Sequence, residues 1–115
     1  MSGPRLPRSG AAAGGWLAVS GHGGHEDGAP TWRARAQTAQ ALADLRQVVE
    51  SHGAGSTDMV KTDVFLVSMH DHAFTNEEYT KVSGDESPMR SAIAVHQLPP
   101  GALVEIEAWL HRPGH

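Results

Sequence analysis

The stretch PMRSAIAVHQLPPGALVEIEAW, residues 88–109, decides the fold of this chain. Two runs of alternating apolar and polar residues flank a Pro-Pro-Gly turn, a pattern typical of two neighbouring strands joined by a short connection. The first run places Arg90 on one face of its strand, and the second places Glu105 and Glu107 together on one face of the other. Glutamate is depleted in strands and costs free energy when its face is covered. We therefore expect these charged side chains to find partners.

Short motifs in the rest of the chain accompany this stretch. They are VSG at 19–21, QTxQAL at 37–42, VKTxVFL at 60–66 and NxxY at 76–79. Together with the motifs of residues 88–109, they resemble the RidA (YjgF-like) family, small trimeric enzymes that hydrolyse reactive imines. The resemblance covers about residues 15–110, and several motifs in one order are more specific than any single motif.

The resemblance implies an α+β fold with a single mixed β-sheet and two helices packed on one face, the chorismate-mutase-like or RidA fold. It implies one domain over residues 1–115, with 1–14 loosely ordered, and a homotrimer whose sheets form a central barrel. Large side chains are few, with two Phe, one Tyr and three Trp. The second face of the sheet is therefore poorly covered by the chain itself, which is compatible with burial against sister subunits.

Hydrophobic periodicity predicts the order strand, helix, strand, helix, strand, strand, after a short edge strand. The edge strand is expected near residues 10–13, a buried strand at 16–20, and a helix at 32–51 with Thr31 as its N-cap and Gly53 and Gly55 as its stop. A strand at 59–69 and a helix of about ten residues that opens at 70–72 follow, before the two strands of 88–109. Loops are expected at 21–30 and 84–87, and a frayed tail at 112–115.

Charge and composition exclude several classes of function. The formal charge is −4 with only nine Lys plus Arg, so we expect no nucleic-acid partner. The chain has no cysteine and hence no disulfide or thiolate metal site. No apolar run is long enough to span a membrane, and residues 1–15 lack the continuous apolar core of a signal peptide. We expect a cytoplasmic protein without membrane contact.

Eight histidines and a glycine-rich segment raise the question of a metal or a cofactor. The close pairs are His22 with His25 and His70 with His72, and neither forms the helical zinc-hydrolase motif. The segment 21–30 follows a strand and precedes a helix, as a dinucleotide-binding turn does. Its third glycine position is taken by Glu26, which would repel phosphate. We expect neither a metal nor a cofactor.

Arg90 is the first candidate for chemistry. A guanidinium offers a rigid fork of donors that matches a carboxylate, and it keeps its charge in any protein environment. From the residues alone, a structural ion pair with Glu105 or Glu107 is the simpler interpretation. The resemblance implies that Arg90 holds the carboxylate of the substrate and that Glu105 orients the hydrolytic water. Glu107 is then structural, although two such carboxylates can titrate together.

Four further residues are candidates for the substrate pocket through the resemblance. They are Ser20, Gly21, Asn76 and Ala92. From the residues alone, Ser20 satisfies backbone groups in a turn and Asn76 is a solvated helix residue. The chain departs from the family pattern, because it lacks the N-terminal Gly-Pro-Tyr, has His22 where glutamine is common, and has Ala92 where the best-studied branch has cysteine.

Our leading hypothesis is the hydrolysis of small carboxylate-bearing imines or enamines of the 2-aminoacrylate type to 2-keto acids and ammonium. This is the activity of a 2-iminobutanoate/2-iminopropanoate deaminase, and it needs no cofactor because the imine carbon is already electrophilic. An alternative is a non-catalytic trimer that binds a small carboxylate metabolite or a partner enzyme, as the missing tyrosine suggests. A ribonuclease, ascribed to some relatives, fits poorly with the acidic charge.

Overall fold

The computed structural model describes residues 10–22, 33–83, 89–98 and 101–112. The strands are β1 (Gly10–Ala13), β2 (Trp16–His22), β3 (Met59–Leu66), β4 (Met89–Ala94) and β5 (Val104–His111). The helices are α1 (Arg33–Ser51) and α2 (His72–Ser83), with 3₁₀ turns at Ser56–Asp58 and Met69–Asp71. The predicted order of elements is confirmed. The predicted N-cap at Thr31, the predicted disorder of residues 1–9 and the loops at 23–30 and 84–87 lie outside the described residues.

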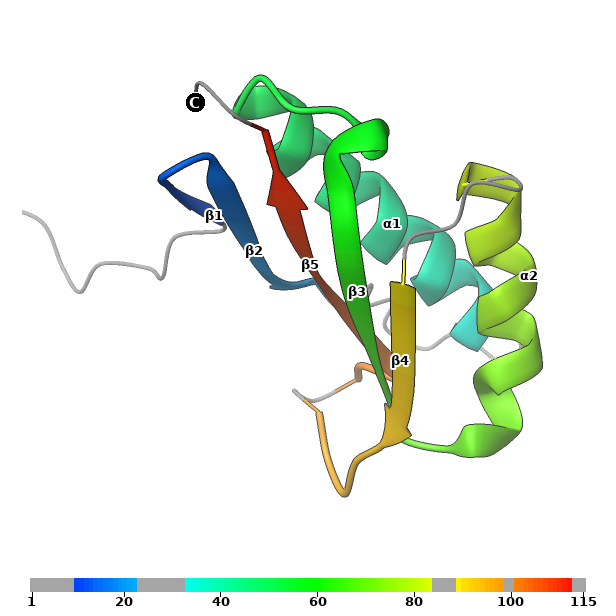
Figure 1. Cartoon of the computed structure of the whole chain (residues 1–115). Coiled ribbons are helices and arrows are strands. Elements are labelled where there is room, and N and C mark those ends of the chain that lie inside the picture. Colours follow the sequence, from blue (N-terminus) through cyan, green and yellow to red (C-terminus); the bar gives the residue numbers. More distant parts are fainter. Residues whose placement is uncertain (1–9, 23–32, 84–88, 99–100, 113–115) are drawn as a thin grey trace, which may run out of the picture.

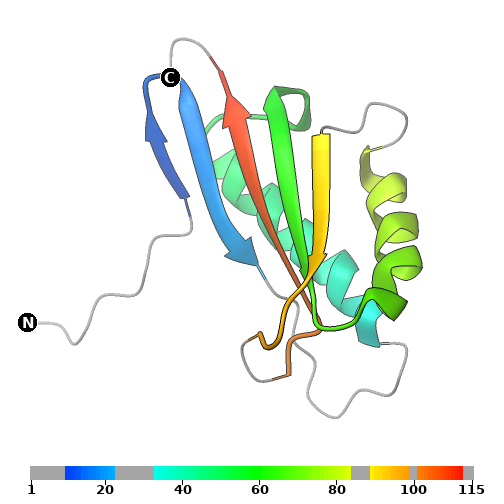
Figure 2. The ribbon, with the colours of Figure 1, turned by 60° about the horizontal axis from the view of Figure 1, so that its bottom comes forward.

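The five strands form one mixed sheet in the order β1-β2-β5-β3-β4. Strands β3 and β4 are parallel, and the other neighbours are antiparallel. Both helices cover the same face of this sheet, as two views of the ribbon show (Figure 1, Figure 2). The expected α+β class, with two helices on one face of a mixed sheet, is confirmed, whereas the trimer and its barrel stay predictions.

One predicted pairing is wrong, because β3 lies between β4 and β5. The connection from β4 to β5 crosses the end of β3. On one side the Val95 N–H donates to the Leu66 carbonyl at 2.8 Å. On the other side the Val67 N–H donates to the Leu103 carbonyl at 3.1 Å. Strands β4 and β5 still run in opposite directions. The sequence pattern of two alternating runs around a turn therefore does not distinguish this arrangement from a hairpin.

Alternation along the strands gives the sheet one covered face and one open face. Eight apolar strand side chains on the covered face are at most 5% exposed, and they are Leu17, Val19, Val64, Leu66, Val104, Ile106, Ala108 and Leu110. They pack with apolar side chains of α1 and with Tyr79 of α2. On the open face Trp16 and Trp109 remain 45% and 46% exposed. The two helices therefore cover one face of the sheet and leave these apolar side chains of the other face exposed.

Two strand boundaries differ from the prediction. β2 is not buried throughout, because its side chains alternate between the two faces. It also continues to His22, through an irregular register with β5 that begins after Val19. β3 ends at Leu66, because the chain enters a 3₁₀ turn at Met69–Asp71.

Gly53 ends helix α1. Its φ of +75° is the left-handed conformation that favours glycine, and its N–H donates to the Glu50 carbonyl at 3.0 Å. Gly55, the second predicted stop, has extended backbone instead. The Gly53 carbonyl accepts a hydrogen bond from the Arg112 guanidinium, and the Arg112 N–H donates to the Gly15 carbonyl at 2.6 Å. The first residue of the predicted frayed tail is therefore anchored.

Gln37 is a polar residue of α1, yet its side chain is fully buried. Its side-chain amide donates to the Gly101 carbonyl at 2.9 Å. Its side-chain oxygen accepts from the Leu103 N–H at 2.7 Å. These two bonds fix the chain immediately before β5, the strand that carries Glu105.

Candidate functional site

Arg90 points to the covered face of the sheet. Its backbone partner on β3 is Thr62, which is fully buried under the helices, and paired residues share a face. The Arg90 Cζ lies 4.2 Å from the centre of the Tyr79 ring on α2. Within the described ranges no carboxylate pairs with Arg90, and its Nη1 atom is buried without a hydrogen-bond partner. The ion pair with Glu105 or Glu107, which the residues alone favoured, is not formed.

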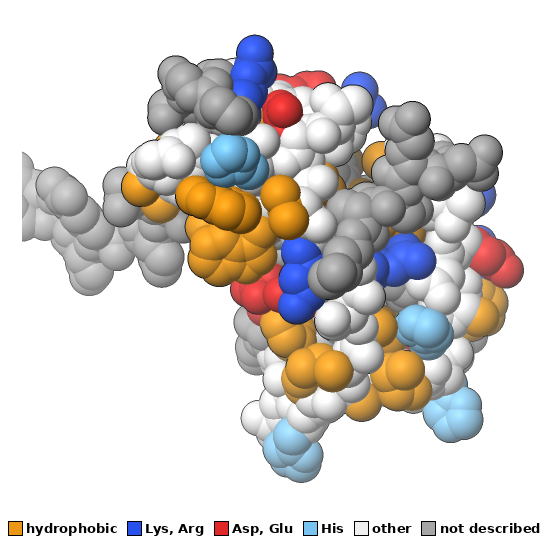
Figure 3. Space-filling model, viewed as in Figure 1, with side chains coloured by type: hydrophobic (Ala, Val, Ile, Leu, Met, Phe, Trp, Pro, Cys, Tyr) orange, Lys and Arg blue, Asp and Glu red, His pale blue; other side chains and the backbone are white. Residues whose placement is uncertain are grey.

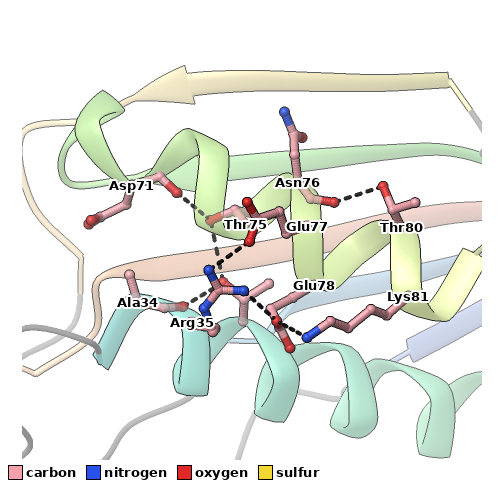
Figure 4. Close-up of polar contacts among 10 residues, drawn as sticks. Ala34, Arg35, Asp71, Thr75, Asn76, Glu77, Glu78, Thr80 and Lys81 are labelled. Atoms are coloured by element: carbon pink, nitrogen blue, oxygen red, sulfur yellow. Dashed lines mark hydrogen bonds and ion pairs between the residues drawn. The ribbon is translucent and has the colours of Figure 1, made fainter.

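Two other predicted site residues belong to the same two elements as this contact. Ala92 follows Arg90 on the same side of β4 and packs against the core cluster that contains Tyr79. Asn76 lies one turn before Tyr79 on α2, and its side chain points away from α1 (Figure 4). The Asn76 amide lies 3.4 Å from His72 Nε2. Arg90, Asn76 and Ala92 thus come from β4 and α2, which meet at Tyr79.

A network of charged side chains holds α2 against α1 (Figure 4). Arg35 of α1 donates to Glu77 at 2.6 Å and to Glu78 at 3.0 Å. Lys81 donates to the same Glu78 oxygen at 2.7 Å. Each partly exposed pair contributes little by itself, but an arginine shared by two carboxylates also fixes geometry. The network links α2, the helix that carries Tyr79, to α1.

Glu105 and Glu107 project from the open face. Their backbone partners on β3 are Phe65 and Asp63, and Ile106 between them on β5 is buried on the covered face. The prediction that the two glutamates point the same way is confirmed. However, they lie on the opposite side of the sheet from Arg90. Within one chain, Arg90 and Glu105 therefore do not face a common space.

A hollow of about 250 Å³ on the open face joins Ser20 to Glu107. It is lined by Gly10, Ala11, Ala18, Val19, Ser20, Glu107 and Trp109. Hydrophobic side chains gather on this side of the molecule over β2 and β5 (Figure 3). Glu105 is not among the lining residues, and Gly21 lies in the irregular part of β2. The carboxylate that shares a hollow with Ser20 is therefore Glu107.

The Glu107 carboxyl lies in an acidic environment. Burial raises its pKa, the neighbouring Asp63 carboxylate raises it further, and Glu105 adds to the effect, while Lys61 lowers it. Lys61 itself lies 3.1 Å from an Asp63 oxygen. Glu107 thus holds its proton to higher pH than an ordinary glutamate does.

A larger cavity of about 400 Å³ lies between α1, α2 and the start of β3. Its lining is mainly apolar, and the charged residues on it, Arg46 and Glu50, pair with each other at 3.2 Å. No predicted site residue lines it. We therefore place the candidate chemistry outside this cavity, despite its greater volume.

Two residues that contribute to these surroundings had no predicted role. Tyr79 stood in the NxxY motif, and its contact with Arg90 depends on how α2 packs against β4. Asp63 occupies the unspecified position of the VKTxVFL motif, and only the register of the sheet reveals that it faces Glu107. In the described part of the chain, no three histidine or acidic side chains converge as metal ligands. No helix in that part is long and apolar enough to cross a membrane.

Comparisons with known proteins give the chain's relationships. A RutC family protein of Pyrococcus horikoshii is 39% identical over 72 residues, which are 63% of this chain and 57% of that protein. The 2-iminobutanoate/2-iminopropanoate deaminase of Rattus norvegicus is 38% identical over 69 residues, 60% of this chain and 50% of that protein. The chain thus spans between half and three-fifths of the length of these curated relatives.

The fold gives the same relationship over more of the chain. The crystal structure of the E. coli YjgF gene product matches with a TM-score of 0.81 and 32% identity, over 96% of this chain and 89% of that one. The family model described as Endoribonuclease L-PSP matches residues 8–111. The chain therefore belongs to the endoribonuclease L-PSP family, which includes the RidA (YjgF-like) proteins that its motifs resemble.

Proposed function

We propose that this protein hydrolyses small imines and enamines of the 2-aminoacrylate type to 2-keto acids and ammonium. The observation that carries the proposal is the state of Arg90, a fixed cation on an aromatic ring with no carboxylate partner among the described residues. Such a guanidinium suits a small carboxylate ligand. Relatives named 2-iminobutanoate/2-iminopropanoate deaminase support the choice of substrate.

We further propose that the site forms between protomers of a trimer. Arg90 and Glu105 project from opposite faces of one sheet, so they act on one substrate only if they come from two chains. The open face, with its half-exposed Trp16 and Trp109, is the surface that a second copy would cover. In this arrangement Ser20, Gly21 and Glu105 of one protomer face Arg90, Asn76 and Ala92 of another.

The reaction then needs only a fixed substrate and an activated water. Arg90 holds the carboxylate, and Glu105 accepts a proton as the water oxygen adds to the carbon of the C=N bond. The same carboxyl returns the proton to nitrogen, which gives a carbinolamine. The carboxyl then transfers the hydroxyl proton of the carbinolamine to nitrogen as the C=O bond forms and the C–N bond breaks, and ammonia leaves and is protonated by solvent. An enamine enters this route after it tautomerises to the imine. No cofactor enters, because the carbon is electrophilic from the start.

A second candidate function is the binding of a small carboxylate without catalysis. The observation that favours it is the separation of Arg90 from Glu105 within one chain, since Arg90 alone can hold an anion. The charge of −4 continues to disfavour RNA as a substrate, although the family model bears the name of an endoribonuclease.

The experiment generates 2-aminoacrylate from serine with a dehydratase and follows the release of the keto acid. The native protein should accelerate release. Arg90→Ala should raise KM about 10- to 100-fold, because it removes a charge-assisted pair. Glu105→Gln should lower kcat by a factor of about 100 or more, the usual contribution of a general base.

Matched controls are Arg46→Ala and Glu50→Gln, which remove the same charges from an exposed pair on α1. Binding of 2-oxobutyrate that depends on Arg90, without acceleration of release, would leave the binding function alone. If the purified protein cleaves RNA and Arg90→Ala abolishes this cleavage, the result would support the ribonuclease function instead.

A further inference from the structure

The Arg90 guanidinium rests on an aromatic ring instead of a carboxylate. Its Cζ lies 4.2 Å from the centre of the Tyr79 ring, well inside the distance at which a cation is attracted to a π face. An acidic partner would neutralise Arg90 and occupy its N–H groups. The Tyr79 ring does not neutralise Arg90, because it attracts the charge only through its π face. It also leaves the N–H groups in the guanidinium plane available, because it accepts no hydrogen bond in that plane. The charge of Arg90 is therefore kept for a ligand.

The ring is itself fixed by β3. Tyr79 is only 3% exposed, and its hydroxyl lies 2.9 Å from the Oγ1 atom of the fully buried Thr62. Thr62 is also the backbone partner of Arg90 across β3 and β4. Each of the three residues thus contacts the other two. Thr62 pairs with Arg90 through the strands, Thr62 hydrogen-bonds to Tyr79, and Arg90 stacks on the Tyr79 ring. Burial raises the pKa of the Tyr79 hydroxyl, so the ring is a neutral phenol around pH 7.

The stacking also removes water from Arg90. Its Nη1 atom is buried and has no hydrogen-bond partner in the described part of the chain. A buried donor without a partner is costly, and an anion that reaches it recovers that cost. The surrounding low dielectric strengthens the attraction further.

From this geometry we infer that Tyr79 is the positioning residue of the carboxylate site, and that its aromatic face, rather than its hydrogen bond to Thr62, orients Arg90. The inference rests on the proposed function of Arg90 and assigns its orientation to a residue that touches no substrate. The inference requires arginine rather than lysine at position 90, because an ammonium group cannot present a planar set of donors above the ring. Ligands are small carboxylates, which such a fork binds through two oxygens.

The test measures the Kd of 2-oxobutyrate by calorimetry, and KM and kcat with enzymatically generated 2-aminoacrylate. Tyr79→Leu removes the π face and should weaken binding and raise KM about 3- to 30-fold, the range of a cation–π contact, with a smaller change in kcat. Tyr79→Phe keeps the face and loses the bond to Thr62. It should melt at a lower temperature yet bind within about threefold of the native protein.

A double variant separates positioning from general damage to the core. In an Arg90→Ala background, Tyr79→Leu should produce no further loss of affinity, because it acts only through Arg90. The control is Val49→Ala, which removes another core side chain that is 2% exposed. It should lower the melting temperature without changing Kd.

The outcomes for the two residues are distinguishable. If Arg90→Ala leaves Kd unchanged, the carboxylate site itself is wrong. If Arg90→Ala weakens binding and folded Tyr79→Leu does not, the site stands and the inference about Tyr79 is overturned. Equal losses in Tyr79→Leu and Tyr79→Phe, or an additive loss in the double variant, would also overturn it.

Discussion

Asp63 and Glu107 face each other across β3 and β5 on the open side of the sheet. Among the residues that the structure describes, Lys61 offers the positive charge to this group, and it lies 3.1 Å from Asp63. Carboxylates directly opposite one another on a sheet repel when both are ionised. The raised pKa of Glu107 is the response to this placement, since a proton removes the repulsion and the cost of burying a charge.

The first prediction is that the titration of Glu107 makes the free energy of unfolding depend on pH. Because its folded pKa is raised, the folded protein binds this proton more tightly than the unfolded chain does. The free energy of unfolding should therefore fall as pH rises from the ordinary carboxyl range through the raised pKa. Glu107→Gln should remove that loss and stabilise the protein at pH 8, by a few tenths to about 1 kcal/mol. Urea unfolding of the native protein and of Glu107→Gln at pH 4 and pH 8 measures these free energies.

The exposed Glu50→Gln serves as its control and should show no such gain at pH 8, because Glu50 pairs with Arg46. A Glu107→Gln variant that is less stable than the native protein at pH 8 would contradict the prediction. So would a gain of equal size at both pH values, since the gain should shrink at pH 4, where Glu107 is protonated in the folded protein.

At the scale of elements, α1 does more than cover the sheet. Gln37 holds the chain before β5 through both ends of its amide. Gln37→Leu would leave the Gly101 carbonyl and the Leu103 N–H without these partners, at a cost of about 2–4 kcal/mol. The second prediction is a loss of that size in the free energy of unfolding, measured with urea, together with faster hydrogen exchange of the Leu103 amide.

Gln40→Leu is the matched control on the same helix. The Gln40 amide donates to Asp44 at 2.9 Å on the exposed side, so its replacement should change stability by less than about 0.5 kcal/mol. Equal effects of the two variants would show that the buried bonds of Gln37 carry no special weight.

The sequence predicted the elements better than their neighbours. Alternation and helical spacing identify each strand and helix, because these patterns record which side of an element is buried. They do not record which strand lies beside which, so β4 and β5 were paired although β3 separates them. The sequence pattern also fails to show which faces of two strands coincide, because that depends on register. It therefore suggested a pairing of Arg90 with Glu105 that the structure does not contain. Gln37 was missed because its partners are backbone atoms of a distant segment.

At the scale of the whole molecule, one chain presents two incomplete halves of the proposed site. Arg90 lies on the helix side of the sheet and Glu105 on the open side. Association through the open face would cover exposed tryptophans and supply each half with its complement. The family resemblance implies that three 12.2 kDa chains associate, and light scattering measures the mass of the particle in solution.

The last prediction uses two inactive variants to test whether the site is shared. Arg90→Ala and Glu105→Gln chains are unfolded together in equal amounts and refolded, so that they assort at random. If each site takes Arg90 from one chain and Glu105 from the next, every mixed trimer contains one intact site. Mixed trimers are about three-quarters of the total, so about a quarter of the native activity should return. Each variant refolded alone is the control and should stay inactive. A site within one chain would recover nothing from the mixture, because no chain in it carries both residues.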